Sequence, residues 1–145
     1  MKNLNILWAS MGGTAENVAN LLNDKANKMG FKTNQQELND VTIADFAKMD
    51  NVAIITSTTG EGDLPTNGED FWLDLKDTDE DLKKLSYSVC ALGDRSHETF
   101  CGAGKKVDEK LLQLGAKKIL DRHECDGSDE GAEEWGKILL SKLNN

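Results

Sequence analysis

The sequence predicts an α/β domain in which a five-stranded parallel sheet, in strand order 2-1-3-4-5, lies between two layers of helices. Short apolar runs alternate with segments whose apolar residues recur at helical spacing. The apolar runs are continuous rather than alternating, which is typical of parallel strands buried on both faces. The 145 residues contain no repeat, low-complexity tract or linker, so residues 1–145 are expected to form a single domain.

Five segments have the composition of strands. Residues 5–9, 52–57 and 87–92 carry consecutive apolar side chains and are expected to be buried strands. The segment 32–38 is more polar, which favours the edge of the sheet, and residues 118–120 begin a fifth strand.

Helices are expected between these strands. Residues 14–29 and 102–114 show helical periodicity, and Gly30 and Gly115 follow them where a helix commonly ends. Two shorter helices are expected at 41–49 and at 71–75, the second with Asn67 as its N-cap, and a last helix at 129–143.

Composition excludes several classes of function. The net charge of −9 argues against a nucleic-acid partner and favours a basic protein partner. The acidic residues gather in two runs, at 61–81 and 121–134. No apolar stretch approaches the ~18 residues of a transmembrane helix, so no membrane association is expected. Three cysteines without paired spacing favour a cytoplasmic protein, which is expected to be a monomer.

Three glycine-containing loops follow the first, third and fourth expected strands, at 10–16, 57–67 and 93–102. The carboxyl ends of parallel strands meet at one edge of the sheet, where ligands bind in this class of fold. The first loop joins a strand to a helix, and its glycines let backbone N–H groups approach an anion. Since no lysine follows these glycines, the loop is not a triphosphate-binding Walker A motif.

Other readings of these residues are weaker. No G-x-G-x-x-G turn follows a strand, so a nicotinamide site is not expected. The spacing from Cys90 to Arg95 is wrong for a tyrosine phosphatase, and the first and third strands lack the terminal acids of a receiver domain. His123 and Cys125 have no further ligands nearby in the sequence, so no metal site is expected. Cys101 lies where a helix begins, a position that can lower a thiol pKa, but a structural role is favoured.

The strings WASMGGTAENVA (8–19), STTGEGDLPTN (57–67) and CALGDRSHETFCGAGKKVDEKLLQLGA (90–116) carry a resemblance. The chain resembles the flavodoxins over its whole length, especially the MioC-type flavodoxins and the FMN domains of sulfite reductase flavoprotein and diflavin reductases. The resemblance implies a flavodoxin-like three-layer sandwich and noncovalent FMN as the cofactor. It assigns residues 10–15 to the FMN phosphate, and the second and third loops to the two sides of the isoalloxazine.

The residues that the resemblance assigns to FMN come from all three loops. Two positions that usually hold aromatic rings against the flavin carry Thr59 and His97 here, and Gly12 replaces a usual hydroxyl residue, so weaker FMN binding is expected. The assigned residues are Ser10, Met11, Gly12, Gly13, Thr14, Ala15, Thr58, Thr59, Gly60, Glu61, Gly62, Leu92, Gly93, Asp94, His97, Phe100, Cys101 and Gly102.

The resemblance implies a low-potential electron carrier without a substrate site of its own. Such a carrier shuttles single electrons between a flavodoxin reductase and an acceptor enzyme, and its acidic rim would steer partners with basic surfaces. The alternative is an interaction module of the same fold that binds FMN weakly or not at all.

Overall fold

The computed structural model describes residues 2–59, 62–93 and 101–144, and its centre is a parallel sheet. The sheet runs in the order β2-β1-β3-β4-β5, and β6 also pairs with β4, which confirms the predicted strand order. The strands are β1 (Asn3–Ala9), β2 (Lys32–Glu37), β3 (Asn51–Thr56), β4 (Ser86–Gly93), β5 (Lys117–Lys118) and β6 (His123–Asp126).

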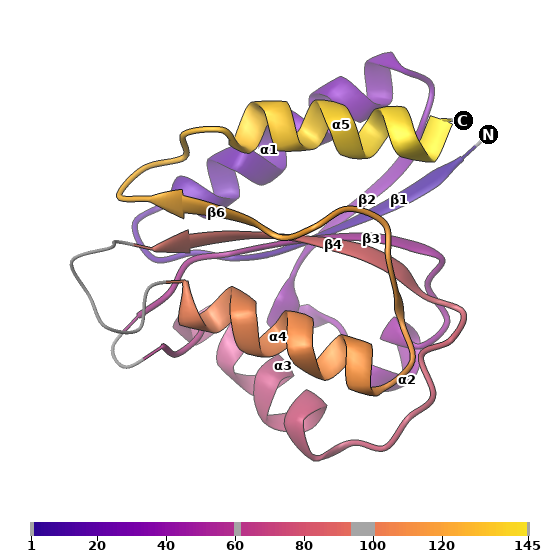
Figure 1. The fold of residues 1–145 in the computed structure, drawn as a ribbon, viewed down its shortest axis with the longest axis vertical. Coiled ribbons are helices and arrows are strands. Elements are labelled where there is room, and N and C mark those ends of the chain that lie inside the picture. Colours follow the sequence, from indigo (N-terminus) through magenta and orange to yellow (C-terminus); the bar gives the residue numbers. More distant parts are fainter. Residues whose placement is uncertain (1, 60–61, 94–100, 145) are drawn as a thin grey trace.

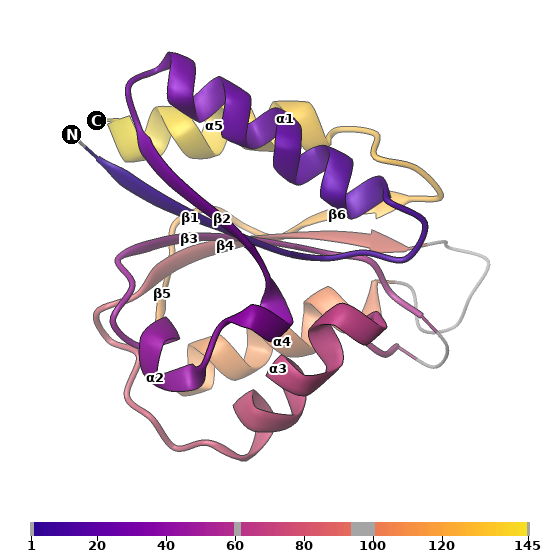
Figure 2. The same cartoon turned by 180° about the vertical axis from the view of Figure 1, so that it is seen from behind.

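Helices cover both faces of the sheet (Figures 1 and 2). On one face lie α1 (Thr14–Lys28) and α5 (Ala132–Asn144), which contact each other. On the other lie α2 (Ile43–Phe46), α3 (Thr66–Asp77) and α4 (Gly102–Gln113). The three-layer α/β architecture expected from the sequence is therefore confirmed.

Two apolar cores lie on either side of the sheet, because neighbouring strand residues point to opposite faces. In β3, Ile54 packs beneath α3 and α4, whereas Ile55 packs beneath α1 and α5, and both are fully buried. The same division holds in β4, where Val89 belongs to the first core and Cys90 to the second. This two-sided burial explains the continuous apolar runs in the sequence.

The fifth strand differs from the prediction, because it is interrupted. Residues 117–118 pair with the start of β4, and residues 123–126 pair with its end. Between them the backbone leaves the ladder, and the Leu120 carbonyl accepts a hydrogen bond from the Ser88 hydroxyl at 3.0 Å. Only Lys118 of the predicted segment 118–120 lies in a strand.

Three helices also differ from their predicted limits. The helix expected at 41–49 is reduced to α2, which begins after Thr42, whose side chain caps it by accepting from the Asp45 N–H at 3.1 Å. The predicted helix 71–75 is longer and begins at Thr66, so the assignment of Asn67 as its N-cap is wrong. The final helix begins at Ala132 rather than 129, after Gly131 in a left-handed conformation.

Candidate cofactor site at the carboxyl edge of the sheet

The start of α1 forms an open cradle of backbone donors. Gly12 and Gly13 have φ values of 80° and 90°, and a Cβ at either would meet nothing within 4 Å. Within the described residues, no protein acceptor contacts the N–H groups of Gly12, Gly13 or Thr14. Because these donors lie at the positive end of a helix dipole, the cradle fits an anion of the size of a phosphate.

Ser10 connects this cradle to the rest of the edge. Its hydroxyl oxygen accepts from the Ala15 N–H at 3.2 Å, so that N–H is already used within the protein. Its own N–H donates to the Asn67 side chain at 3.1 Å, which joins the first loop to the first turn of α3. Met11, between Ser10 and Gly12 in the chain, is 63% exposed. The first loop is thus held from both sides while its outer surface stays open.

The second and third loops contact each other at the start of α4. The Ala103 N–H donates to the Thr58 hydroxyl at 3.3 Å. A Cβ on Gly102 would lie only 2.8 Å from the Cα of Gly62, so the two backbones approach where only glycine fits. Together with the Ser10–Asn67 bond, these contacts bring the described parts of all three predicted loops to one edge of the sheet (Figure 1).

Cys101 has a structural place in this edge. It has a φ of 53° just before α4, and its thiol donates to the Ala91 carbonyl at 3.4 Å. Burial, followed by the charge of Glu124, raises the pKa of the Cys101 thiol to about 12. The position at a helix start therefore does not activate this thiol, which agrees with the structural role favoured from the sequence.

The predicted site residues fall into three groups. Ser10, Gly12 and Thr14 are among those with exposed or partly exposed groups at the edge, whereas Ala15, Leu92 and Cys101 are buried in the two cores. Exposed or partly exposed as well are Met11, Gly13, Thr58, Thr59, Gly93 and Gly102, whereas Gly62 is buried. The assignments of all these residues to FMN stay predictions. Gly60, Glu61, Asp94, His97 and Phe100 lie outside the described residues.

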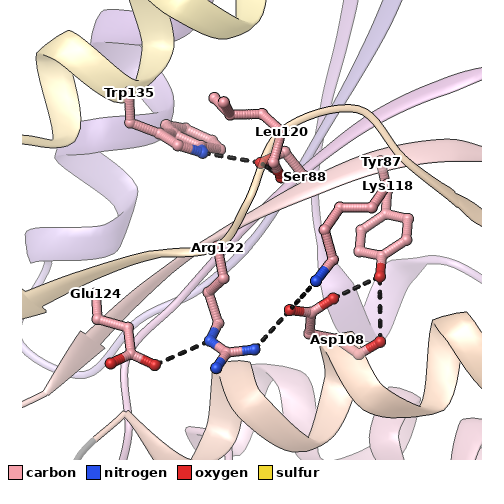
Figure 3. Close-up of polar contacts among 8 residues, drawn as sticks. All are labelled: Tyr87, Ser88, Asp108, Lys118, Leu120, Arg122, Glu124 and Trp135. Atoms are coloured by element: carbon pink, nitrogen blue, oxygen red, sulfur yellow. Dashed lines mark hydrogen bonds and ion pairs between the residues drawn. The ribbon is translucent and has the colours of Figure 1, made fainter.

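A buried ionic network joins α4 to β4 and to residues 118–124 (Figure 3). The Asp108 carboxylate is 2% exposed, accepts from the Tyr87 hydroxyl and pairs with Arg122. Lys118 lies 3.3 Å from it, and Arg122 also binds Glu124 at 2.9 Å. Burial, followed by the hydrogen bond to Asp108, raises the pKa of Tyr87 above its ordinary value. The network joins Lys118 of β5 and Arg122, which precedes β6, to α4.

Two residues at the site were missed by sequence reasoning. Asn67 supports the first loop through its side chain, although its position in the sequence indicated only a helix cap. Lys106 of α4 lies 3.5 Å from Asp63 of the second loop and 5.0 Å from the centroid of the Trp72 ring. No sequence signal identifies Lys106, because its two partners come from other elements.

Among the described helices, none has the length and apolar character needed to span a bilayer. Trp8 and Trp135 are buried in the core beneath α1 and α5, and Trp72 is partly buried against the core on the other face. The described part of the chain contains no group of three or more His, Cys, Asp or Glu side chains that could hold a metal ion.

Solved structures of similar fold are flavodoxins. The flavodoxin of Streptococcus pneumoniae TIGR4 is 30% identical, with a TM-score of 0.85 over 98% of this chain and 97% of its own. A C101A mutant of flavodoxin from Pseudomonas aeruginosa is 28% identical, with a TM-score of 0.83 over 99% of both chains.

Curated relatives are larger redox proteins. The sulfite reductase [NADPH] flavoprotein alpha-component of Vibrio parahaemolyticus is 38% identical over 143 residues, which are 97% of this chain and 23% of that protein. NADPH–cytochrome P450 reductase of Bos taurus is 35% identical over 125 residues, 83% of this chain and 18% of that protein. This chain thus spans about a quarter or less of these relatives. The flavodoxin family model matches residues 6–135, and the chain belongs to the flavodoxin family, which implies FMN as its cofactor.

Proposed function

We propose that this chain binds FMN at the three loops and carries single electrons between redox proteins. The observation that carries the proposal is the open cradle at the start of α1, where Gly12, Gly13 and Thr14 present backbone donors. These groups would hold the FMN phosphate, with the Ser10 hydroxyl as an additional donor. The glycines leave the approach free, since no Cβ fills it.

The second and third loops would flank the isoalloxazine ring. Thr58, Thr59 and Gly62 would contact one side, and residues 93–102 the other. When bound, FMN supplies the one-electron chemistry, and the protein supplies binding, orientation and the electrostatic surroundings. Thr59 cannot stack as an aromatic ring would, so we expect FMN affinity below that of a site with two aromatic neighbours.

We propose that this protein is a carrier rather than an enzyme that turns over a substrate. Its partners would be a reductase and an acceptor enzyme with basic surfaces, because α3, which follows the second loop, presents the exposed acids Glu69, Asp70, Asp74 and Asp77. The described thiols are all free and buried, which suits a reducing cytoplasm. We expect a monomer.

A cofactor titration tests the proposal. Apo-protein is titrated with FMN while flavin fluorescence and visible absorption are recorded, and riboflavin serves as the ligand without a phosphate. We expect saturable FMN binding, at least tenfold weaker riboflavin binding, and two separable one-electron steps in a potentiometric titration. Failure to bind FMN would overturn the proposal and favour the interaction module of the same fold.

A further inference from the structure

Lys106 joins three elements beside the second loop. Its ammonium group lies 3.5 Å from a carboxylate oxygen of Asp63 and 5.0 Å from the centroid of the Trp72 ring. Lys106 belongs to α4, Trp72 to α3, and Asp63 to the connection between β3 and α3. Lys106 therefore connects α4 to α3 and to the second loop.

Asp63 is bonded in turn to Thr59. Their backbones exchange two hydrogen bonds, from the Thr59 N–H to the Asp63 carbonyl and from the Asp63 N–H to the Thr59 carbonyl, each at 2.8 Å. The Gly62 N–H also donates to the Thr59 carbonyl at 3.2 Å. The position of Asp63 is thus coupled to that of Thr59, a residue that the family resemblance assigns to the isoalloxazine.

Lys106 differs from Lys25, Lys83 and Lys84, which also pair with carboxylates, because it lies over an aromatic ring. Exposure alone does not set its ion pair apart, since Lys106 and Asp63 are 29% and 66% exposed, close to the 33% and 70% of Lys25 and Glu133. Solvent-exposed pairs of that kind contribute little, because water screens them and the side chains lose entropy. The ring of Trp72 restricts the Lys106 side chain before it meets Asp63, so less entropy is lost in forming this pair.

We propose that Lys106 is a positioning residue for FMN: it holds Asp63, and through Asp63 it fixes Thr59 at the edge of the cofactor site. The proposal rests on the proposed binding of FMN for its functional consequence. The geometric part concerns the protein alone, since every contact in it is made between protein groups.

Two variants separate charge from packing. Lys106→Met keeps the apolar stem over Trp72 and removes the ammonium group, whereas Lys106→Arg keeps a cation that can both stack and pair. Lys110→Met is the matched control, because it removes one positive charge from the same helix at a residue with no ion pair among the described residues. Asp63→Asn, alone and with Lys106→Met, tests whether the two residues act as a pair.

The first measurement is amide hydrogen exchange in the apo-protein. We expect Lys106→Met to accelerate exchange at Thr59, Gly62 and Asp63 about fivefold, while the core amides of β3 are unchanged. Lys106→Arg and Lys110→Met should stay within about twofold of the parent protein. Equal acceleration in the core would show a general loss of stability and overturn the positioning role.

The second measurement is FMN affinity by flavin fluorescence. We expect the dissociation constant to rise about fivefold in Lys106→Met and Asp63→Asn, and no further in the double variant. Lys106→Met values equal to those of Lys110→Met in both measurements would overturn the proposal. If the parent protein bound no FMN, the proposed function would fail, and the exchange measurement on the apo-protein would still decide whether Lys106 positions Thr59.

Discussion

The helices α1 and α4 begin at the same edge of the sheet but meet different surroundings there. Each follows a residue in a left-handed conformation, Gly13 with φ 90° and Cys101 with φ 53°. The start of α1 is open, because nothing lies within 4 Å of a Cβ placed on Gly12 or Gly13. The start of α4 is closed, because Gly62 packs against Gly102. The same strand–loop–helix unit can thus present its donors to a ligand or use them within the protein.

The residues that the two helices bury also differ. The buried residues of α1 are all apolar, whereas α4 buries the Asp108 carboxylate among Tyr87, Lys118 and Arg122 (Figure 3). Removing one partner of a buried charge pair is strongly destabilising, so the packing of α4 depends on this network, whereas the packing of α1 depends on apolar contacts alone. We infer that α4 forms the scaffold of the site and that α1 provides its binding surface.

Removing the buried charge of α4 gives the largest expected effect. Asp108→Ala leaves the Tyr87 hydroxyl with only the backbone carbonyl of residue 108, at 3.2 Å, and removes the carboxylate that pairs with Lys118 and Arg122. We therefore expect a loss of about 3 kcal/mol in the free energy of unfolding. Urea denaturation of the apo-protein measures it. Asp24→Ala, at an exposed position of α1, should change stability by less than ~0.5 kcal/mol. Equal losses in the two variants would remove the distinction between the helices.

A pair of glycine substitutions tests the open and closed helix starts directly. Gly102→Ala places a Cβ 2.8 Å from the Gly62 backbone, which must move, and we expect a loss of about 2 kcal/mol. In Gly12→Ala the new Cβ meets no atom within 4 Å, and the loss of stability comes only from placing a side chain at positive φ, about 1 kcal/mol. Thermal unfolding of both apo-proteins compares them. A neutral Gly102→Ala would show that the start of α4 is not tightly packed.

The sequence predicted the open side of the site better than the closed side. Local patterns sufficed for the cradle, because a strand, two glycines and a helix are consecutive in the chain. The network that joins α4 to the segment before β6 depends on Asp108 and Arg122, which are 14 residues apart, and no local pattern encodes that pair. Asn67 shows the same limit: its position predicts a cap, but its side chain meets Ser10 from a distant loop.

Alkaline pH should weaken both sides of the sheet. Cys90 lies beneath α1 and α5, and its pKa is raised by its hydrogen bond to Cys125 and by burial, whereas Cys101 and Tyr87 lie on the α4 side. The pKa of Cys101 is raised to about 12 and that of Tyr87 is raised as well, chiefly by burial, whereas in the unfolded chain they ionise near 9.0 and 10.0. Stability from each group is therefore complete below its unfolded pKa and falls as pH rises toward its folded pKa. We expect a loss of about 1.4 kcal/mol per pH unit for each group.

Two variants test which groups cause this loss of unfolding free energy at alkaline pH. The free energy of unfolding is measured in urea between pH 8 and 11, and Cys101→Ala should reduce the slope above pH ~9, and Tyr87→Phe above pH ~10. A slope unchanged in both variants would contradict the assignment of the loss to Cys101 and Tyr87.

The smallest effect concerns a serine whose hydroxyl belongs to the open side. Ser10→Ala removes the acceptor of the Ala15 N–H, and we expect a loss of about 1 kcal/mol in apo-protein stability. Ser128→Ala is the matched control, since that hydroxyl accepts from the Glu130 N–H at the same distance of 3.2 Å in a loop before α5. Both variants should lose similar stability, but only Ser10→Ala should raise the FMN dissociation constant, by about fivefold. If Ser10→Ala and Ser128→Ala changed the FMN dissociation constant equally, the effect would come from the lost hydrogen bond to a backbone N–H. The Ser10 hydroxyl would then support the loop without contacting FMN.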